Sequence, residues 1–489
     1  MDSNDNELKT ASSENRESKL ESVNSPPEYP ELDKPTLASL DNLLFGSQPN
    51  PQDVERWHTQ GFMFSEHSNL PFGLIQLYGG PCGILAPIQA YILRDMIFSP
   101  NRIQSFQNND VPLRPNNAQR SEALVRTLSD IIVRSASSDE YIVLLTSDGE
   151  RILRTPSVNA INIRAFISSN MSSFHSKIGV LLFIYTVILN RGIKQVLADI
   201  DDPQPLVQRF GHCSQELVNL MICGRASTNV FDGEKVLGDS EEQNEHAYSL
   251  KGIPQQNEIG FLTVLEALRY SKVGDYYKTP KCPIWVVGSS SHYTVMFALN
   301  SNIGKLSPEE ERKRTMKKIF QQLDPHENGF VLFDKLPELI ALTDLQFTAE
   351  QIRKEIKGDA EVLLFLDFFA AILQCEASDQ DWSCSACTFL NVASNLSCEI
   401  CQTIKPETKL VKDVVANHEL VPSNFTLYHY NGIEGHKNAQ AECRCVKVWP
   451  DQGDPSNWGH EGLAEVIQTK WPYALVQFPG EFPHEPKIT

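Results

Sequence analysis

A tight turn that ends in a cysteine is the first candidate for chemistry in this sequence. The turn is Gly79-Gly80-Pro81, and Cys82 stands where it meets a largely apolar run from Ile84 to Phe98. Such a run predicts a buried helix, and a helix N-terminus offers unpaired N–H groups and the positive end of a dipole, which favour a thiolate. Cys82 is therefore a candidate nucleophile; a cysteine that only packs at a turn would have the same local pattern.

A cysteine nucleophile needs a base and donors for the oxyanion, and the sequence offers candidates for both roles. Gln76 precedes Cys82 by six residues, and His292 stands at the start of an apolar strand pattern. His212, which precedes a helical pattern, is the alternative base. In papain-like hydrolases the cysteine opens a buried helix, the histidine lies on a strand far downstream, and an upstream glutamine donates to the oxyanion. Gln76, Cys82 and His292 occur in that order and in those contexts.

Four cysteines later in the chain have the spacing of a structural metal site. Cys384, Cys387, Cys398 and Cys401 form the pattern Cys-x2-Cys-x10-Cys-x2-Cys. Paired Cys-x2-Cys knuckles hold one zinc ion tetrahedrally through four thiolates, which leaves no open position for catalysis. A segment this short has no core, so metal binding would supply most of its folding free energy. The sequence therefore predicts a small structural zinc finger.

The residues around these cysteines resemble the Ran-binding-protein type of zinc finger. Trp382 stands two residues before the first cysteine and Asn391 four after the second, as in that family. One branch of the family binds single-stranded RNA through Arg side chains between the knuckles. No Lys or Arg lies between Cys387 and Cys398, which argues against that branch.

The other branch of this finger family binds ubiquitin. It uses a Thr-Phe pair after the second cysteine and an apolar residue between the last two, and Thr388, Phe389 and Ile400 match that pattern. Apolar side chains exposed on so small a unit suit a partner surface. The resemblance implies that these three residues bind ubiquitin; a finger that only braces the fold is the alternative.

Composition limits the class of protein. The chain has 489 residues, of which 41% are hydrophobic, and a net charge of -19. This length predicts two or three domains, and this charge argues against a general binder of nucleic acid or acidic membranes. The longest apolar run, Ile178 to Leu189, is too short to cross a bilayer, and no signal-peptide pattern opens the chain. Eleven cysteines, four of them clustered, indicate a reducing compartment, so we expect the cytoplasm, the nucleus or both.

The order of these patterns predicts five segments. Residues 1–36 are polar and acidic and are predicted to be a disordered tail. Residues 37–300 form the predicted catalytic domain, 301–377 a helical subdomain, and 378–407 the zinc finger. Residues 408–489 contain short strand patterns with little core of their own, so we expect them to pair with the earlier sheet.

Helices and strands are both predicted in the catalytic segment. Predicted helices follow Cys82 and cover 124–136, 174–189 and 261–270; predicted strands cover 141–145, 283–288 and the residues from His292, with three more at 425–432, 443–449 and 464–478. Asn431-Gly432 is a hairpin signal. The sequence thus predicts an α+β fold.

The helical subdomain contains a decayed calcium loop. Asp324, Asn328 and Gly329 occupy loop positions one, five and six. Position three is His326, and position twelve is Lys335 where a bidentate Glu is needed. A lysine in place of that carboxylate should abolish useful affinity. We therefore expect an EF-hand-like helix–loop–helix unit that packs without calcium.

Longer motifs in this chain resemble the MINDY deubiquitinases, most of all their third and fourth members. The motifs are Gln76-x-x-Gly-Gly-Pro-Cys82, Phe261-Leu-Thr-Val-Leu-Glu-Ala-Leu-Arg-Tyr, Pro283-Ile-Trp-Val-Val-Gly-Ser-x-x-His292-x-Thr-Val and Tyr428-His-Tyr-Asn-Gly. The resemblance runs from about residue 40 to residue 478, interrupted by the finger, which departs from the family pattern. It implies a papain-like cysteine protease fold, with the helical subdomain and the finger inserted.

The resemblance also implies an activity and a set of roles. The chain would hydrolyse isopeptide bonds in polyubiquitin, preferring the linkage type that marks proteins for the proteasome. Cys82 matches the nucleophile, His292 the general base and acid, and Gln76 the oxyanion donor; no residue matches a third triad member that orients His292. No catalytic cofactor is expected, and the partners are ubiquitin and its chains, with no nucleic acid or membrane. The protein itself is expected to be a monomer.

Two other functions fit the same residues. A catalytically inactive adaptor would bind ubiquitin chains through the finger and use the protease fold as a scaffold. A cysteine protease for a ubiquitin-like modifier or another peptide would need the same nucleophile and base.

Overall fold

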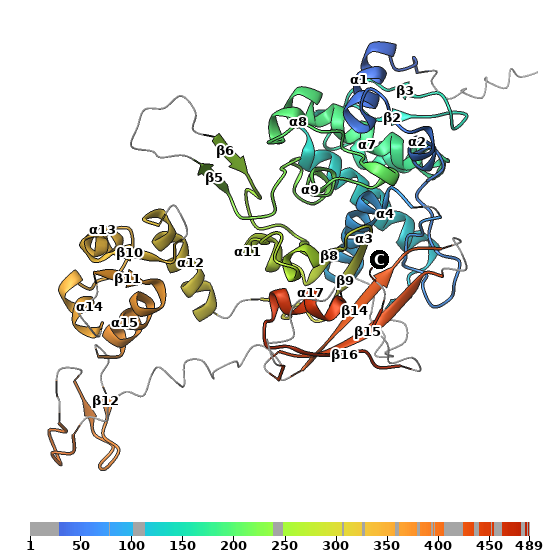
Figure 1. Cartoon of the computed structure of the whole chain (residues 1–489). Helices are drawn as coiled ribbons and strands as arrows, with labels where there is room; N and C mark the ends of the chain where they lie inside the picture. The colour runs from blue at the N-terminus through green and yellow to red at the C-terminus, as the bar shows by residue number, and fades with distance from the viewer. Residues whose placement is uncertain are drawn as a thin grey trace, which may run out of the picture.

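A six-stranded sheet carries several of the segments that the sequence patterns single out. In this computed structural model the strands lie in the order β16-β15-β14-β9-β8-β7 (Figure 1). β7 and β8 pair in parallel, and the other neighbours are antiparallel. The strands are β7 (Gly260–Thr263), β8 (Ile284–Gly288), β9 (Tyr293–Phe297), β14 (Phe425–Asn431), β15 (Glu442–Trp449) and β16 (Leu475–Gln477).

The centre of the sheet is buried on both faces. Ile284 and Val286 of β8 belong to the larger core, to which α3 (Cys82–Phe98) contributes, whereas Trp285 and Val287 belong to a second core with α17 (Leu463–Lys470). A strand covered on both faces is a continuous apolar run in sequence, and β8 has that pattern. The predicted return of the C-terminal strands to the earlier sheet is confirmed, because β14 pairs with β9.

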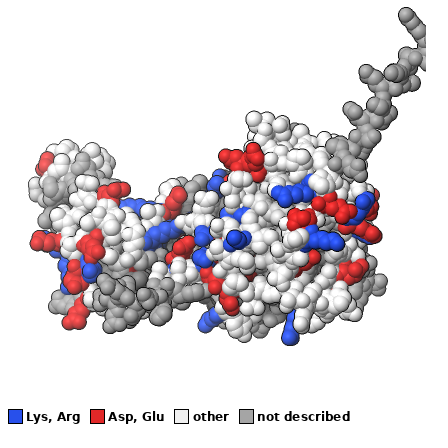
Figure 2. All heavy atoms as spheres, turned by 90° about the horizontal axis from the view of Figure 1, so that it is seen from above, with Lys and Arg blue, Asp and Glu red and all other residues white. Residues whose placement is uncertain are grey.

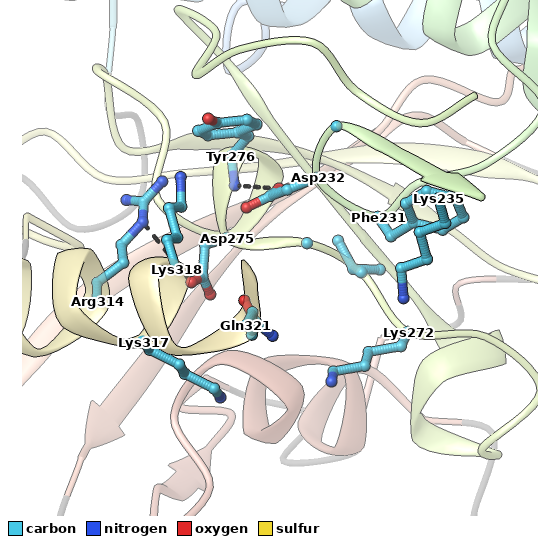
Figure 3. A pocket seen from close by; sticks show the side chains of 13 residues that line it. Phe231, Asp232, Lys235, Lys272, Asp275, Tyr276, Arg314, Lys317, Lys318 and Gln321 are labelled. Carbon is cyan, nitrogen blue, oxygen red and sulfur yellow. Dashed lines mark hydrogen bonds and ion pairs between the residues drawn. The ribbon is translucent and has the colours of Figure 1, made fainter. Parts of the chain in front are cut away.

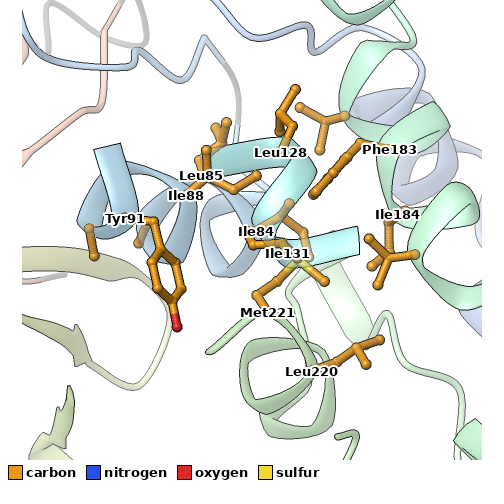
Figure 4. Packing of buried hydrophobic residues seen from close by; sticks show 14 of the residues in the cluster. Ile84, Leu85, Ile88, Tyr91, Leu128, Ile131, Phe183, Ile184, Leu220 and Met221 are labelled. Atoms are coloured by element: carbon orange, nitrogen blue, oxygen red, sulfur yellow. The ribbon is translucent and has the colours of Figure 1, made fainter. Parts of the chain in front are cut away.

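α3 lies at the centre of the helical layer. It contacts β8, β9, α4 (Asn117–Ser135) and α9 (Gln215–Cys223), and α4 also packs on α7 (Gly179–Arg191). Figure 4 shows this packing, with Ile84, Leu85 and Ile88 among Leu128, Ile131, Phe183, Ile184, Leu220 and Met221. Almost all of α3 is buried, which accounts for its apolar residues on more than one face. Pro87 lies inside α3, and the helix continues through it.

The structure describes residues 29–488 except 78, 101–112, 238–247, 306–307, 325–327, 357–360, 379–381, 393–394, 396, 405–423, 435–439, 451, 454–461, 481–484 and 487. The other elements of the catalytic part are α1 (Lys34–Phe45), α2 (Pro51–Trp57), α5 (Ile163–Ser169), α6 (Met171–His175), α8 (Ile193–Asp199), η1 (Arg209–Gly211), α10 (Val264–Ala267) and α11 (Asp275–Lys278), with the strand pairs β1 (Glu140–Tyr141) and β4 (Val158–Asn159), β2 (Leu144–Leu145) and β3 (Leu153–Arg154), and β5 (Glu234–Leu237) and β6 (Tyr248–Lys251). Within the described ranges no single helix is long and apolar enough to cross a bilayer; α7 and α8 reach that length only together, across an 84° bend.

A helical subdomain stands to one side of the catalytic part and has its own core (Figure 1). It consists of α12 (Pro308–Gln322), β10 (Phe330–Leu332), η2 (Phe333–Lys335), α13 (Leu336–Ala341), α14 (Ala349–Glu355), β11 (Val362–Leu364) and α15 (Phe365–Ser378). β10 and β11 form an antiparallel pair that joins two helix–loop–helix units. In the loop after α12, the Asp324 carboxylate accepts hydrogen bonds from the N–H groups of Asn328 and Gly329, at 2.9 and 2.7 Å.

α12 contacts the catalytic part around a basic pocket of about 260 Å³. Arg314 lies 3.6 Å from the Asp275 carboxylate and donates to the Thr279 hydroxyl at 2.9 Å, while the Lys318 ammonium lies 4.0 Å from the centre of the Tyr276 ring (Figure 3). Elsewhere charge is mixed: on the face seen in Figure 2, acidic and basic side chains are interspersed.

Three predictions of local structure are wrong. The predicted helix at 261–270 is β7 followed by the short α10, and the first half of the predicted strand at 464–478 is α17. The predicted disordered tail extends too far, because Leu32 is buried and its N–H donates to the Ile152 carbonyl at 2.8 Å; residues 1–28 lie outside the described residues. In each case contacts with distant segments decide the structure, by pairing for β7 and Leu32 and by packing for α17, and a local pattern does not contain that information.

Candidate active site

Cys82 is the first residue of α3, as the turn residues predicted. Gly80 has a φ of 141°, a conformation that L side chains rarely adopt, and a Cβ there would lie 3.4 Å from the Gly211 carbonyl oxygen. The Pro81 carbonyl accepts from the N–H groups of Ile84 and Leu85, which starts the helix. The first N–H groups of a helix have no partner within it, so this turn points donors at the space beside the Cys82 thiol.

The Cys82 thiol is buried and protonated at rest. Its Sγ donates to the Gly80 carbonyl oxygen across 3.6 Å, and only 2% of the residue is exposed. Burial raises the pKa of Cys82 to about 11, against the opposing effect of the backbone N–H groups of Tyr293 and Gly83. A thiol with this pKa needs a neighbouring base to become a nucleophile.

His292 lies immediately before β9, in the short turn from β8. The turn is fixed by the Ser289 hydroxyl, which accepts from the His292 N–H at 3.0 Å, and by the Ser289 N–H, which donates to the His292 carbonyl at 2.9 Å. The imidazole is almost completely buried, and burial lowers the pKa of His292 to about 4. His292 is therefore neutral at physiological pH and able to accept a proton.

Asn431, at the end of β14, orients His292. Its Oδ1 lies 3.3 Å from Nε2 of His292 and accepts from the Ile433 N–H at 3.1 Å. Because Ile433 donates to this atom, the atom is the amide oxygen, and Nε2 of His292 must carry the proton that it donates. The lone pair of the neutral imidazole is then on Nδ1. Asn431 is therefore a candidate for the third member, for which the sequence offered no residue.

The sequence contained a signal at this position, because Asn431-Gly432 indicated a hairpin. The hairpin forms, since β14 pairs antiparallel with β15, but its connection runs as far as Glu442, so Asn431-Gly432 is not a two-residue turn. Gly432 instead uses its carbonyl to accept from the Gln76 N–H at 2.8 Å, and the Gln76 carbonyl accepts from the Glu434 N–H at 2.9 Å. The end of β14 is thereby bonded to the segment that precedes Cys82.

A cavity of about 20 Å³ brings the three predicted residues together. Gln76, Cys82 and His292 line it, along with Gln89 and Tyr430 among others. This volume is about that of one water molecule or one carbonyl oxygen. His212, the alternative base, is not among the described residues that line this cavity. The geometry therefore favours His292 as the base.

A second thiol lies beside the first. Cys213 is buried, and its Sγ donates to the same Gly80 carbonyl oxygen, again across 3.6 Å. Gly83 makes room for it, since a Cβ at Gly83 would lie 2.9 Å from the Cys213 sulfur. Burial raises the pKa of Cys213 well above its usual value. Cys213 does not line the cavity that contains His292, which leaves Cys82 as the thiol next to a base.

The four spaced cysteines come together as predicted. The sulfur atoms of Cys384, Cys387, Cys398 and Cys401 all lie within 4.8 Å of one another, with separations of 3.4 and 3.5 Å for two of the pairs. Thiolates around a tetrahedral zinc ion lie roughly 3.8 Å apart, since Zn–S bonds are about 2.3 Å long. The donor set and its spacing therefore fit one metal ion.

The finger presents the three predicted ubiquitin-binding side chains to solvent. Thr388 has a φ of 60° and follows a knuckle, Phe389 is 37% exposed, and Ile400 is 65% exposed. The strands β12 (Trp382–Ser383) and β13 (Leu390–Asn391) pair behind them. The finger also exposes Leu390, Val392 and Ile404, and several exposed apolar side chains on so small a unit are typical of a contact surface.

Comparisons with known proteins identify similar chains. A family model described as "Deubiquitinating enzyme MINDY-3/4, conserved domain" matches residues 41–316. Bovine (Bos taurus) "Ubiquitin carboxyl-terminal hydrolase MINDY-3" is 30% identical over 489 residues, covering 89% of this chain and 95% of the relative. Mouse (Mus musculus) "Probable ubiquitin carboxyl-terminal hydrolase MINDY-4" is 33% identical over 303 residues, covering 58% of this chain and 39% of the relative. No solved structure matches the chain.

Proposed function

This chain belongs to the MINDY-3/4 family of deubiquitinating enzymes, and on that premise we propose that Cys82 is the nucleophile with which it hydrolyses isopeptide bonds in polyubiquitin. The observation that supports this assignment is the shared cavity of Cys82, His292 and Gln76, in which a distant strand brings His292 to the segment that carries the other two. A complete set of nucleophile, base and oxyanion donor favours an enzyme over an inactive adaptor.

The first chemical step is the formation of the thiolate. His292 has a depressed pKa and a proton on Nε2, so Nδ1 accepts the proton from the Cys82 thiol as the sulfur attacks the carbonyl carbon of ubiquitin's C-terminal glycine. The side-chain amide of Gln76 and the N–H of Cys82 donate to the oxyanion. Asn431 holds the imidazolium by accepting from Nε2.

The second half of the reaction releases the products. The His292 imidazolium gives its proton to the leaving lysine amine, which breaks the isopeptide bond and leaves ubiquitin as a thioester on Cys82. His292 then takes a proton from water, whose oxygen attacks the thioester and frees the ubiquitin C-terminus. The Cys82 sulfur leaves as a thiolate and is reprotonated by His292.

The papain-like class is part of this proposal. α3 carries the nucleophile at its N-terminus and packs on a largely antiparallel sheet, whose strand β9 follows the base and whose strand β14 supplies an asparagine. A Cys-His-Asn set is the arrangement of papain-like proteases. We also place the enzyme in the cytoplasm or nucleus, where cysteines stay reduced.

Substrate linkage is tested with a panel of linkage-defined ubiquitin chains of several lengths. We propose that chains of the proteasome-targeting linkage are cleaved at least ~tenfold faster than the others, a difference that unequal binding of chain geometry can supply. Equal rates for every linkage would remove the linkage proposal and leave the hydrolase. Failure to cleave any chain, combined with reaction toward an electrophilic probe of a ubiquitin-like modifier, would show that the substrate is another modifier.

We further propose that the four-cysteine cluster holds structural zinc. Zinc would fix the two knuckles, Cys384 with Cys387 and Cys398 with Cys401, and supply no chemistry to the cleavage reaction. The EF-hand-like loop is proposed to need no calcium, because the Asp324 carboxylate is already engaged by the backbone of Asn328 and Gly329 and position twelve is Lys335.

The finger is proposed to be a second ubiquitin contact, formed by Thr388, Phe389 and Ile400. In a Cys82→Ala background, which prevents cleavage, Phe389→Ala should weaken binding of ubiquitin chains about tenfold while the zinc content stays at that of the parent. Ile404 is 77% exposed on the same finger, so Ile404→Ala is a matched control that should bind normally. Unchanged binding by Phe389→Ala would mean that the finger only braces the fold or has another partner.

A further inference from the structure

Phe210 combines two properties that do not stabilise the free protein. It has a φ of 63°, which is an unfavourable conformation for a bulky side chain, and 66% of it is exposed. An exposed aromatic residue contributes little packing, and a strained backbone costs free energy. Such a residue persists only where the surrounding structure imposes its conformation, and these positions cluster at functional sites.

Contacts from α2 impose that conformation. The Phe210 N–H donates to the Asp53 carboxylate at 3.1 Å, and the Phe210 carbonyl accepts from Arg56 at 2.7 Å. The next carbonyl, that of Gly211, accepts from the indole N–H of the buried Trp57 at 3.0 Å. Both peptide groups around Phe210 are thus fixed, while its ring is left in solvent.

The loop that carries Phe210 lies against the turn before Cys82. A Cβ at Gly211 would lie 3.7 Å from the Gly80 Cα, and a Cβ at Gly80 would lie 3.4 Å from the Gly211 carbonyl oxygen. Phe210 is one residue from Gly211, and Cys82 is two residues from Gly80. Since consecutive Cα atoms are about 3.8 Å apart, the Phe210 Cα lies within roughly 16 Å of the Cys82 Cα, which is about the length of five extended residues. Its ring also packs edge-on to His212, with centroids 6.3 Å apart.

We propose that Phe210 is a specificity-determining residue that packs against apolar side chains of ubiquitin's extended C-terminal tail. The inference rests on the proposed function, because that function brings the tail to Cys82. The bound of roughly 16 Å equals the length of about five extended residues, so the Phe210 backbone lies within the span of the last residues of a tail that ends at Cys82. The ring offers a flat apolar face at a fixed position, and binding covers the surface that is exposed in the free enzyme.

The first test compares Phe210→Ala with wild type on two substrates, ubiquitin carrying a C-terminal fluorogenic amide and a peptide of its last five residues carrying the same group. We expect kcat/KM to fall about tenfold on both substrates, mainly through a higher KM. Ile161, which is 89% exposed, provides the control Ile161→Ala, whose kcat/KM should match wild type. An unchanged kcat/KM for Phe210→Ala, or a loss on ubiquitin without a loss on the peptide, would overturn the tail contact.

A glycine variant separates substrate contact from a structural role. Glycine adopts a φ of 63° freely, so Phe210→Gly should melt no lower than wild type and still lose about tenfold in kcat/KM. If Phe210→Gly melts lower and its rate of Cys82 alkylation by iodoacetamide changes, Phe210 serves the fold and the proposal fails. Wild-type turnover that is lost in Cys82→Ala shows separately that the proposed function holds.

Discussion

Replacing Cys82 by alanine should reduce kcat/KM for isopeptide cleavage by roughly four orders of magnitude or more, because alanine lacks the thiol that forms the proposed thioester. The variant should fold, since Cys82 fills a buried position beside Gly80 and alanine leaves only a small void. The measurement is single-turnover cleavage of a ubiquitin chain, together with labelling by ubiquitin that carries a C-terminal electrophile. Wild type should form a covalent adduct and Cys82→Ala should not.

Cys213 provides the matched control for this experiment. Its thiol is buried and bonded to the same carbonyl oxygen, yet it is not in the cavity with His292. Cys213→Ala should therefore cleave chains within about threefold of wild type, with any loss arising from packing against Gly83. Activity retained by Cys82→Ala and lost in Cys213→Ala would reassign the nucleophile. Activity retained by both variants would contradict a cysteine mechanism.

Replacing Asn431 by alanine should lower kcat about a hundredfold with a smaller change in KM, because the imidazole loses the acceptor that fixes its tautomer and orientation. The hydrogen bond from Nε2 at 3.3 Å also favours the protonated form of His292, opposing the burial that lowers its pKa. Asn431 is expected to act through His292, to which its side chain is bonded. A higher KM with an unchanged kcat would rule out this positioning role.

An aspartate at position 431 tests the role more sharply. Asn431→Asp keeps the acceptor and adds a negative charge, which stabilises the imidazolium and raises the pKa of His292 from its present value of about 4. Because His292 must be neutral to accept the thiol proton, the acid limb of the kcat/KM profile should move to higher pH in Asn431→Asp. At pH values above that acid limb, Asn431→Asp should also be more active than Asn431→Ala. A purely structural role predicts no such movement.

The sequence was sufficient for residues whose signal is local or shared with known families. Cys82 follows a Gly-Gly-Pro turn and opens an apolar helix, so its place was predictable from its neighbours. The four cysteines of the finger were equally predictable, because two Cys-x2-Cys knuckles determine their own geometry. Gln76 and His292 became candidates through their order along the chain, and the structure brings both to one cavity.

Elements that depend on distant pairing could not be predicted in the same way. Phe261 to Thr263 is apolar enough for either a helix or a strand, and its parallel pairing with β8 makes it β7. Asn431 carried a genuine turn signal, but its neighbours bond to Gln76 and its side chain bonds to His292. No local pattern in the sequence indicates that β14 lies beside β9.

The position of β14 has a consequence for the biogenesis of the enzyme. The ribosome synthesises Cys82 and His292 long before Phe425–Asn431, yet β14 must pair with β9 before Asn431 can reach the imidazole. In a nascent chain the proposed nucleophile and base are therefore not yet aligned, and this edge of β9 stays unpaired until β14 arrives. A product terminated before residue 425 would keep the earlier segments but lack Asn431, so the proposed alignment of His292 depends on the synthesis of β14.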